Sequence, residues 1–150
     1  MTRALPVLFA LALGAAPSAL AQGAPGLPGQ AAAGAGEDGA LIAAVQRQTD
    51  AYNAHDAKAY AACFAPDAQL IQHPGIAQVQ GRDDIYKTFA RVFREHGKVQ
   101  MRILYRAQLG PSTVIEHQVV EGLGGAPVPS LVIYSLKGGV IQAAWFVGAE

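Results

Sequence analysis

The sequence predicts an α+β domain in which three helices pack on the concave face of a strongly curved, mainly antiparallel sheet. Apolar residues recur at helical spacing up to His96, whereas after Lys98 they alternate with polar residues as in half-buried strands. The connections between the later strands are short. Such connections require antiparallel neighbours, because a parallel crossover needs a dozen or more residues. Helices followed by an antiparallel meander are typical of the α+β class.

The first 21 residues are typical of a secretory signal peptide. Arg3 precedes an apolar run from Leu5 to Leu13, and Ala19-Leu20-Ala21 then forms a small-residue cleavage pattern. The run is shorter than the roughly 20 apolar residues that a membrane-spanning helix needs. We therefore predict cleavage before Gln22 and a periplasmic or secreted protein with no membrane contact once the signal peptide is removed.

Residues 22–38 predict a flexible tether, because they are mostly Gly, Ala, Pro and Gln and include no aromatic residue. The remaining residues, 39–150, have the length of one small domain with a single core. The predicted organisation is therefore a signal peptide at residues 1–21, a tether and one folded domain.

The chain carries 11 basic and 11 acidic side chains, so its formal net charge is zero. This balance gives no electrostatic reason to bind nucleic acid or an anionic membrane. No cofactor is predicted, because the glycine-rich loop at residues 122–125 joins two strands and lacks the helix N-terminus that holds phosphate. No metal site is predicted either, because the histidines lack ligand spacing. They are His55, His73, His96 and His117.

Apolar residues at helical spacing predict a first helix over about residues 39–54, with Gln48 as a polar exception on its buried face. Asp56 is a suitable N-cap for a short second helix that ends before Pro66. The same spacing over residues 83–96 predicts the third helix. Cys63 in the second helix is interpreted as a small buried hydrophobe in preference to a reactive thiol.

A short strand at residues 69–73 is expected to end at the turn pair Pro74-Gly75, so that His73 lies at its exit. Four further strands are expected to form a meander of antiparallel neighbours. Their approximate ranges are 99–106, 113–120, 128–136 and 140–147.

The strand at residues 113–120 carries the ionisable pair Glu116-His117. Successive strand side chains point to opposite faces, so Ile115, His117 and Val119 share one face. We expect that face to line a pocket. Glu116 lies on the other face and is expected at the surface or in a subunit contact.

Helices that close the concave side of a curved sheet enclose a cone, which is the expected shape of a small-molecule pocket. Gln48 and Tyr52 lie one helical turn apart on the inward face of the first helix and are expected to point hydrogen-bond donors into the pocket. The residues predicted to bind the ligand are Gln48, Tyr52, Phe89, Ile115, Val119 and Trp145.

Five segments of the chain carry a family resemblance: AAVQRQTDAYNAHD, CFAPDAQLIQHPG, QGRDDIYKTF, TVIEHQVVEG and LVIYSLKGGVIQAAWFV. They resemble the SnoaL-like branch of the nuclear-transport-factor-2-like superfamily. The resemblance covers the chain after the tether and implies a cystatin-like cone. It does not imply a reaction, because this superfamily hosts isomerases, cyclases, hydrolases, dehydratases and proteins without enzymatic activity.

Ketosteroid isomerases are the best-known enzymes of this superfamily. Their tyrosine on the first helix, their aspartate base and their protonated aspartate correspond by resemblance to Gln48, His73 and Val132. None of the three catalytic residue types is retained, so a straightforward ketosteroid isomerase is not expected.

Two functions from different classes stay open. The first is an exported protein that binds a small apolar or carbonyl-containing molecule without transforming it. The second is an isomerase, cyclase or lyase that moves a proton next to a carbonyl, with His73 and His117 as acid and base. The last two strands are apolar on both faces, which also predicts a homodimer through the exposed face of the sheet.

Overall fold

A computed structural model describes residues 38–148 of the protein. Within them are the helices α1 (Asp38–Asn53), α2 (Ala57–Ala62) and α3 (Arg82–Glu95). The strands are β1 (Phe64–Gln72), β2 (Ile76–Gln80), β3 (Gln100–Leu109), β4 (Thr113–Glu121), β5 (Val128–Lys137) and β6 (Val140–Gly148). The arrangement confirms the predicted α+β class. The expected signal peptide, and the expected tether up to residue 37, lie outside the described residues.

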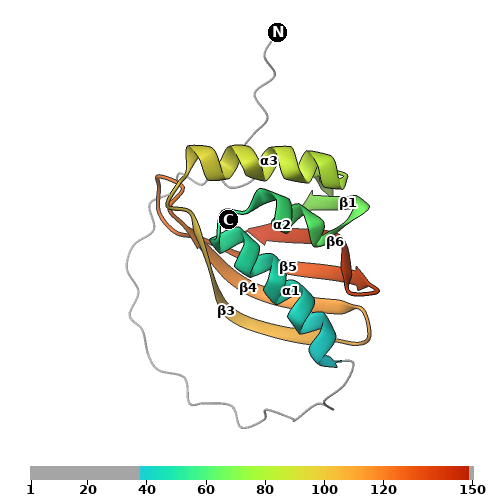
Figure 1. Ribbon diagram of the computed structural model, residues 1–150. Helices are drawn as coiled ribbons and strands as arrows, with labels where there is room; N and C mark the ends of the chain where they lie inside the picture. The colour runs from blue at the N-terminus through green and yellow to red at the C-terminus, as the bar shows by residue number, and fades with distance from the viewer. Residues whose placement is uncertain (1–37, 149–150) are drawn as a thin grey trace, which may run out of the picture.

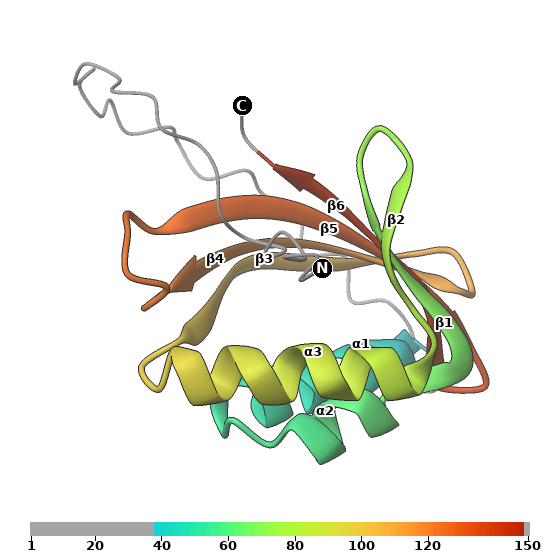
Figure 2. The same cartoon turned by 90° about the horizontal axis from the view of Figure 1, so that it is seen from above.

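The strands form one sheet in the order β2-β1-β6-β5-β4-β3. Neighbours are antiparallel except for β1 and β6, which pair in parallel. All three helices lie on the same side of the sheet, which bends around them (Figures 1 and 2). The concave face therefore carries the helices, as predicted. Within residues 38–148, no helix has the length and apolar character needed to cross a membrane.

The first strand begins earlier than expected and has an unexpected partner. β1 starts at Phe64 instead of residue 69, and β2 pairs with its second half. Pro66 and Asp67 suggested a turn. The register between β1 and β6 shifts between Phe64 and Gln69, however, so the proline lies at an irregularity where no ladder hydrogen bond is lost.

The corner between α1 and α2 is attached to the start of β3. Asn53 Nδ2 donates to the Met101 carbonyl (2.9 Å), and the Met101 N–H donates to Asn53 Oδ1 (2.7 Å). His55 has a left-handed φ of 56°, and its Nε2 lies 2.7 Å from the Val99 carbonyl oxygen. These bonds hold α1 against β3 and so position the inward side chains of the helix.

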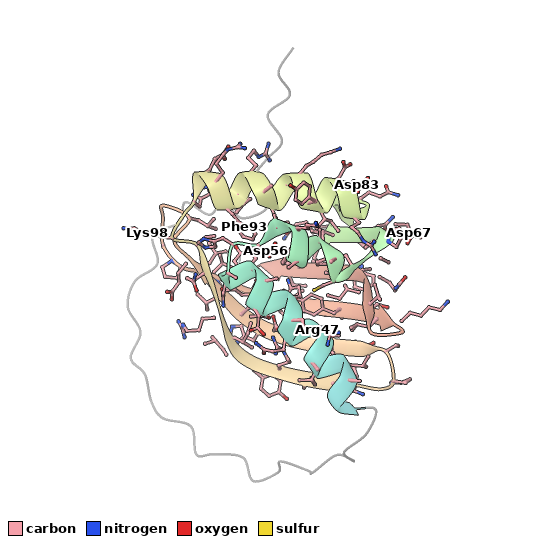
Figure 3. The ribbon with its side chains drawn as sticks, in the orientation of Figure 1. Arg47, Asp56, Asp67, Asp83, Phe93 and Lys98 are labelled. Carbon is pink, nitrogen blue, oxygen red and sulfur yellow. The ribbon has the colours of Figure 1, made fainter. Side chains whose placement is uncertain are left out.

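Aromatic side chains fill the space between the helices. Tyr52 and Tyr60 pack against α3, with ring centroids 5.2 Å apart for Tyr52 and Phe93 and 4.2 Å apart for Tyr60 and Phe89. Phe93 lies on the side of α3 towards α2 (Figure 3). All four rings are buried. This packing fixes both tyrosines in the interior. There the pKa of Tyr60 is raised, mainly by burial and to a smaller extent by the charge of Glu116 on β4.

Candidate functional site

Strand β4 separates a polar interior from an apolar exterior. Its side chains alternate as predicted, but the two faces are reversed. Glu116 and Gln118 are 0 % exposed on the face towards the helices, whereas His117 between them is exposed. The expectation that Glu116 lies at the surface or in a subunit contact is therefore wrong. Strand parity alone does not reveal that this carboxylate has a charged partner inside the domain.

That partner is Arg106, which lies opposite Glu116 on β3. Arg106 Nε donates to Glu116 Oε2 at 2.6 Å, and the two side chains are 10 % and 0 % exposed. The other guanidinium nitrogens reach α1: Nη2 donates to Thr49 Oγ1 (2.8 Å) and Nη1 donates to Gln46 Oε1. One arginine therefore links β3, β4 and α1, a role that suits the rigid guanidinium fork.

Burial raises the pKa of Glu116 above its ordinary value, and the charge and hydrogen bond of Arg106 oppose that rise. Tyr134 of β5 also lowers the Glu116 pKa, because its hydroxyl group lies beside the carboxyl group. The pKa of Tyr134 is itself raised, first by burial and then by the negative charge of Glu116. A buried carboxyl group with a raised pKa holds its proton more tightly than a free one, and shifts of this kind are common at functional sites.

Polar side chains from α1 and α2 belong to the same group. Burial raises the pKa of Tyr60, a hydrogen bond from Gln48 opposes the rise, and the charges of Tyr52 and Glu116 add to it. Burial also raises the pKa of Tyr52. We call this group the interior polar cluster, and its members are Gln48, Tyr52, Tyr60, Arg106, Glu116 and Tyr134.

Four oxygen atoms of the cluster have no hydrogen-bond partner among residues 38–148. They are Gln48 Oε1, Tyr52 Oη, Glu116 Oε1 and Tyr134 Oη. Glu116 and Tyr134 shift each other's pKa, although the geometry between Glu116 Oε1 and Tyr134 Oη is not that of a normal hydrogen bond. Each buried polar atom without a partner costs about 1–3 kcal/mol, and folded proteins contain few of them. Four in one cluster is therefore unusual, although two of them, Glu116 Oε1 and Tyr134 Oη, lie beside each other.

A second polar pair lies on the same inward face. Gln118 Nε2 donates to Ser130 Oγ of β5 at 3.3 Å, and both residues are buried. Within the described residues, Gln118 Oε1 has no hydrogen-bond partner. The polar interior therefore extends along β4 beyond Glu116.

The outer face of the sheet is apolar and partly exposed. His117 lies in register between Tyr105 of β3 and Leu131 of β5. Tyr105 is 61 % exposed, Leu131 38 % and Trp145 36 %. Exposed apolar area of this kind usually marks an interaction surface. We call it the outer apolar face, and its members are Tyr105, Ile115, His117, Leu131, Ile133, Trp145 and Val147.

The residues predicted to bind the ligand divide between the two faces of the sheet. Those that lie in the interior are Gln48, Tyr52 and Phe89. Those that lie on the outer face of the sheet are Ile115, Val119 and Trp145. The expectation that all six line one cone is therefore wrong. These strands carry apolar residues on both faces, so periodicity separates the faces without showing which one meets the helices.

The two predicted catalytic histidines do not share a cavity. His117 projects from the outer face. His73 is exposed at the exit of β1, where its backbone N–H donates to the Phe146 carbonyl (2.9 Å). Strands β6 and β5 lie between β1 and β4. At about 4.8 Å per strand, the histidines are roughly 14 Å apart. Their predicted chemistry therefore lacks the shared pocket that it requires.

A hollow of about 400 Å³ lies at the start of α3, apart from the cluster. Figure 3 labels one of its lining residues, Asp83. It is lined by Pro66, Gln80, Gly81, Arg82, Asp83, Asp84 and Lys87. Its wall is charged, and Lys87 already pairs with Asp84 at 3.2 Å. The interior polar cluster, by contrast, is buried between the helices and the sheet. Among residues 38–148, no three His, Cys, Asp or Glu side chains gather as metal ligands.

Comparison with protein families matches residues 45–144 to the SnoaL-like domain. The chain belongs to the SnoaL-like family. The matched range includes every member of the interior polar cluster, so the cluster is part of the family domain and not of an added segment. A search of the curated proteins finds no significant match to this SnoaL-like protein.

Several solved structures share the fold. An uncharacterised cystatin-fold protein from Novosphingobium aromaticivorans has a TM-score of 0.67 at 20% identity, over 71% of this chain and 96% of that one. A putative SnoaL-like polyketide cyclase from Jannaschia sp. CCS1 has a TM-score of 0.65 at 14% identity, over 77% and 90%. A protein with a ketosteroid isomerase-like fold from Catenulispora acidiphila, in complex with trimethylamine, has a TM-score of 0.60 at 23% identity, over 69% and 82%. These identities establish the fold alone.

Sequence reasoning missed the interior carboxyl group, although a signal for it exists. A hairpin that turns at Pro111 places Arg106 opposite Glu116, and opposite charges at facing positions of two strands tend to pair. Tyr134 offers no such signal, because β5 is apolar at most positions. Its place beside Glu116 follows from the register between β4 and β5.

Proposed function

We propose that this SnoaL-like protein binds a small, largely apolar molecule with a carbonyl or hydroxyl oxygen inside the cone. The observation that supports this is the set of buried oxygens of the interior polar cluster that lack a hydrogen bond of normal geometry, above all Gln48 Oε1 and Tyr52 Oη. Aromatic and aliphatic side chains surround them, and an apolar frame with a few polar groups is the usual composition of a small-molecule site. Arg106 is already paired with Glu116. The cluster therefore has no spare positive charge and favours a neutral molecule over an anion.

Isothermal titration with 1-tetralone, a neutral bicyclic ketone, and with tetralin, the matching hydrocarbon, tests this binding. We expect 1-tetralone to bind about tenfold more tightly, since one hydrogen bond in a dry site contributes about 1.4 kcal/mol. Tyr134→Phe should remove most of that preference. The matched control Tyr105→Phe, on the outer apolar face, should keep it. Equal binding of ketone and hydrocarbon by the wild-type protein would overturn the proposal.

The raised pKa of Glu116 supports a second candidate function, proton transfer next to a carbonyl. In this reaction Glu116 Oε1, the oxygen that Arg106 leaves free, takes a proton from the carbon beside the carbonyl. A tyrosine hydroxyl from Tyr52 or Tyr134 donates a hydrogen bond to the developing enolate oxygen. The protonated Glu116 then returns the proton to carbon. The putative polyketide cyclase of the same fold makes ketones a reasonable class of probe.

Deuterium exchange tests the proton transfer separately from binding. The protein is incubated with 1-tetralone in heavy water, and incorporation at the carbon beside the carbonyl is followed by NMR. We expect Glu116→Gln to slow the protein-dependent exchange by about a hundredfold or more. The binding of 1-tetralone should persist in that variant. Equal exchange rates would discard the proton-transfer role and leave the binding proposal standing.

We also propose that residues 1–21 direct export and that the segment up to α1 is a tether. The apolar run after Arg3 and the small residues before Gln22 support this. N-terminal sequencing of the protein from its native host, after cell fractionation, should find a chain that begins at Gln22 in the periplasm or the medium. An uncleaved chain in the cytoplasm would contradict it.

A homodimer through the outer apolar face is a separate proposal. Its support is the exposed apolar area around Leu131 and Trp145. Trp145 is the only tryptophan in the sequence, so its fluorescence reports directly on this face. We expect its emission to shift to shorter wavelength as the protein concentration rises and sedimentation to give a dimeric mass. A monomeric mass at micromolar concentration would contradict the proposal.

A further inference from the structure

We infer that the bound molecule carries two polar groups and that Gln118 and Ser130 bind the second one. This inference rests on the proposed binding in the cone and extends it to the chemical class of the molecule. That class is a neutral compound with a carbonyl at one end and a hydroxyl or N–H donor at the other.

The two polar sites lie one step apart on the same face of the sheet. Gln118 follows Glu116 by two residues on β4, so both side chains point inward and their Cα atoms are about 7 Å apart. On β5, Val132 lies opposite Glu116 and Ser130 lies opposite Gln118. Val132 is fully buried on the inward face. Along β5, Val132 lies between Tyr134 and Ser130, so the hydroxyl groups of the two sites are separated by an apolar side chain. This arrangement suits a molecule whose two polar groups are joined by an apolar frame.

The two sites differ in the hydrogen-bonding groups that they leave without a partner. Gln118 uses its Nε2 to donate to Ser130 Oγ, and the remaining atom, Oε1, can only accept. A carbonyl oxygen cannot satisfy it, whereas a hydroxyl or N–H group can. The interior polar cluster also has the acceptors Gln48 Oε1 and Glu116 Oε1, but its Tyr52 and Tyr134 hydroxyl groups can donate to a carbonyl, which Gln118 Oε1 cannot do. The molecule is therefore oriented, with its carbonyl towards Tyr134 and its donor towards Gln118.

Folding alone does not account for Gln118. Its side chain is 0 % exposed, and its hydrogen bond to Ser130 Oγ is 3.3 Å long, near the long end of the normal range. Its Oε1 lacks a partner within residues 38–148. An apolar side chain of similar size would fill the same space without this cost. A residue that lowers stability and presents an acceptor to the interior is better explained by recognition.

Titration with 6-hydroxy-1-tetralone and 1-tetralone tests the inference, because the two probes differ only in the hydroxyl group at the end opposite the carbonyl. We expect wild type to bind the hydroxylated ketone about tenfold more tightly. Gln118→Met should abolish this difference and give an equal or higher midpoint of thermal unfolding. Retention of the full difference, or equal loss of both probes, would overturn the inference.

Ser130→Ala provides a second variant, which tests the site even where Gln118→Met does not fold. It should reduce the preference for the hydroxylated ketone by a few fold, because Gln118 loses the partner that orients its amide. The matched control is Ser135→Ala on the other face of β5, which should leave the preference unchanged. If wild type prefers 1-tetralone to tetralin but binds both ketones equally, this inference is overturned and the proposed function survives. If neither ketone binds, both are overturned.

Discussion

The two faces of β4 reverse the usual distribution of polarity in a globular domain. The inner face buries Glu116 and Gln118, whereas the outer face presents His117 beside the exposed side chains of Tyr105 and Leu131. Buried polar groups and exposed apolar groups both lower stability unless something else contacts them. On the functions proposed above, each face contacts a different molecule. The inner face suits a small ligand, and the outer face suits a second subunit.

The largest expected effect comes from the inner face. Arg106→Met leaves the carboxyl group of Glu116 buried without its counter-charge, so we expect the free energy of unfolding to fall by about 3–5 kcal/mol. Urea denaturation measures it. The matched control is Arg102→Met on the same strand, whose ion pair with Glu121 is exposed and contributes less than about 1 kcal/mol. Similar losses for both arginines would contradict the distinction between the two faces.

The next effect comes from the outer face. Leu131→Asp places a charge in the proposed dimer interface, so we expect the dimer to weaken by about a hundredfold or more, because burying an unpaired charge costs several kcal/mol. Sedimentation measures the mass, and the affinity for 1-tetralone should not change. The control Ile76→Asp alters an equally apolar, 63 % exposed residue of β2 outside the outer apolar face. The proposed interface is wrong if both variants stay dimeric.

A smaller, pH-dependent effect should distinguish the two faces further. The pKa of Glu116 is raised in the folded protein from its ordinary value of 4.5. The folded state therefore holds this proton more tightly than the unfolded state, and the stability that results is present below pH 4.5 and is lost as pH rises through the folded pKa. The stability of wild type relative to Glu116→Gln should fall over that range, by at most about 1.4 kcal/mol per pH unit.

Denaturation curves of both proteins between pH 4 and 8 measure this difference. The other titrating groups are common to both chains, so their contributions cancel in the comparison. A difference that rises with pH would show that Arg106 outweighs burial and lowers the pKa of Glu116.

The smallest effect is expected for His117→Ala. An exposed outer-face ring contributes little to the fold, so the free energy of unfolding should change by less than about 0.5 kcal/mol in the monomeric Leu131→Asp background. Deuterium exchange into 1-tetralone should continue at the wild-type rate. If His117→Ala stops the exchange and Glu116→Gln does not, the histidine hypothesis is restored and the interior assignment fails.

Local features of the sequence determined most of the fold. The change of apolar spacing from helical to alternating located the three helices and the four-stranded meander, because spacing depends on neighbouring residues alone. Pro111 and Gly138-Gly139 located two of the turns by the same kind of local preference. β2 and the parallel pairing of β1 with β6 escaped detection, because they depend on contacts between segments far apart in the chain.

The sequence also determined that Glu116 and His117 lie on opposite faces of one strand. Only the tertiary structure decided which face is inside. Both faces of β4 carry polar and apolar residues, so burial of apolar surface alone does not choose between them. Arg106 from β3 offsets part of the cost of desolvating the Glu116 carboxylate on the inner face, and Thr49 of α1 binds the same guanidinium. Those partners come together only when the helices close the concave side of the sheet.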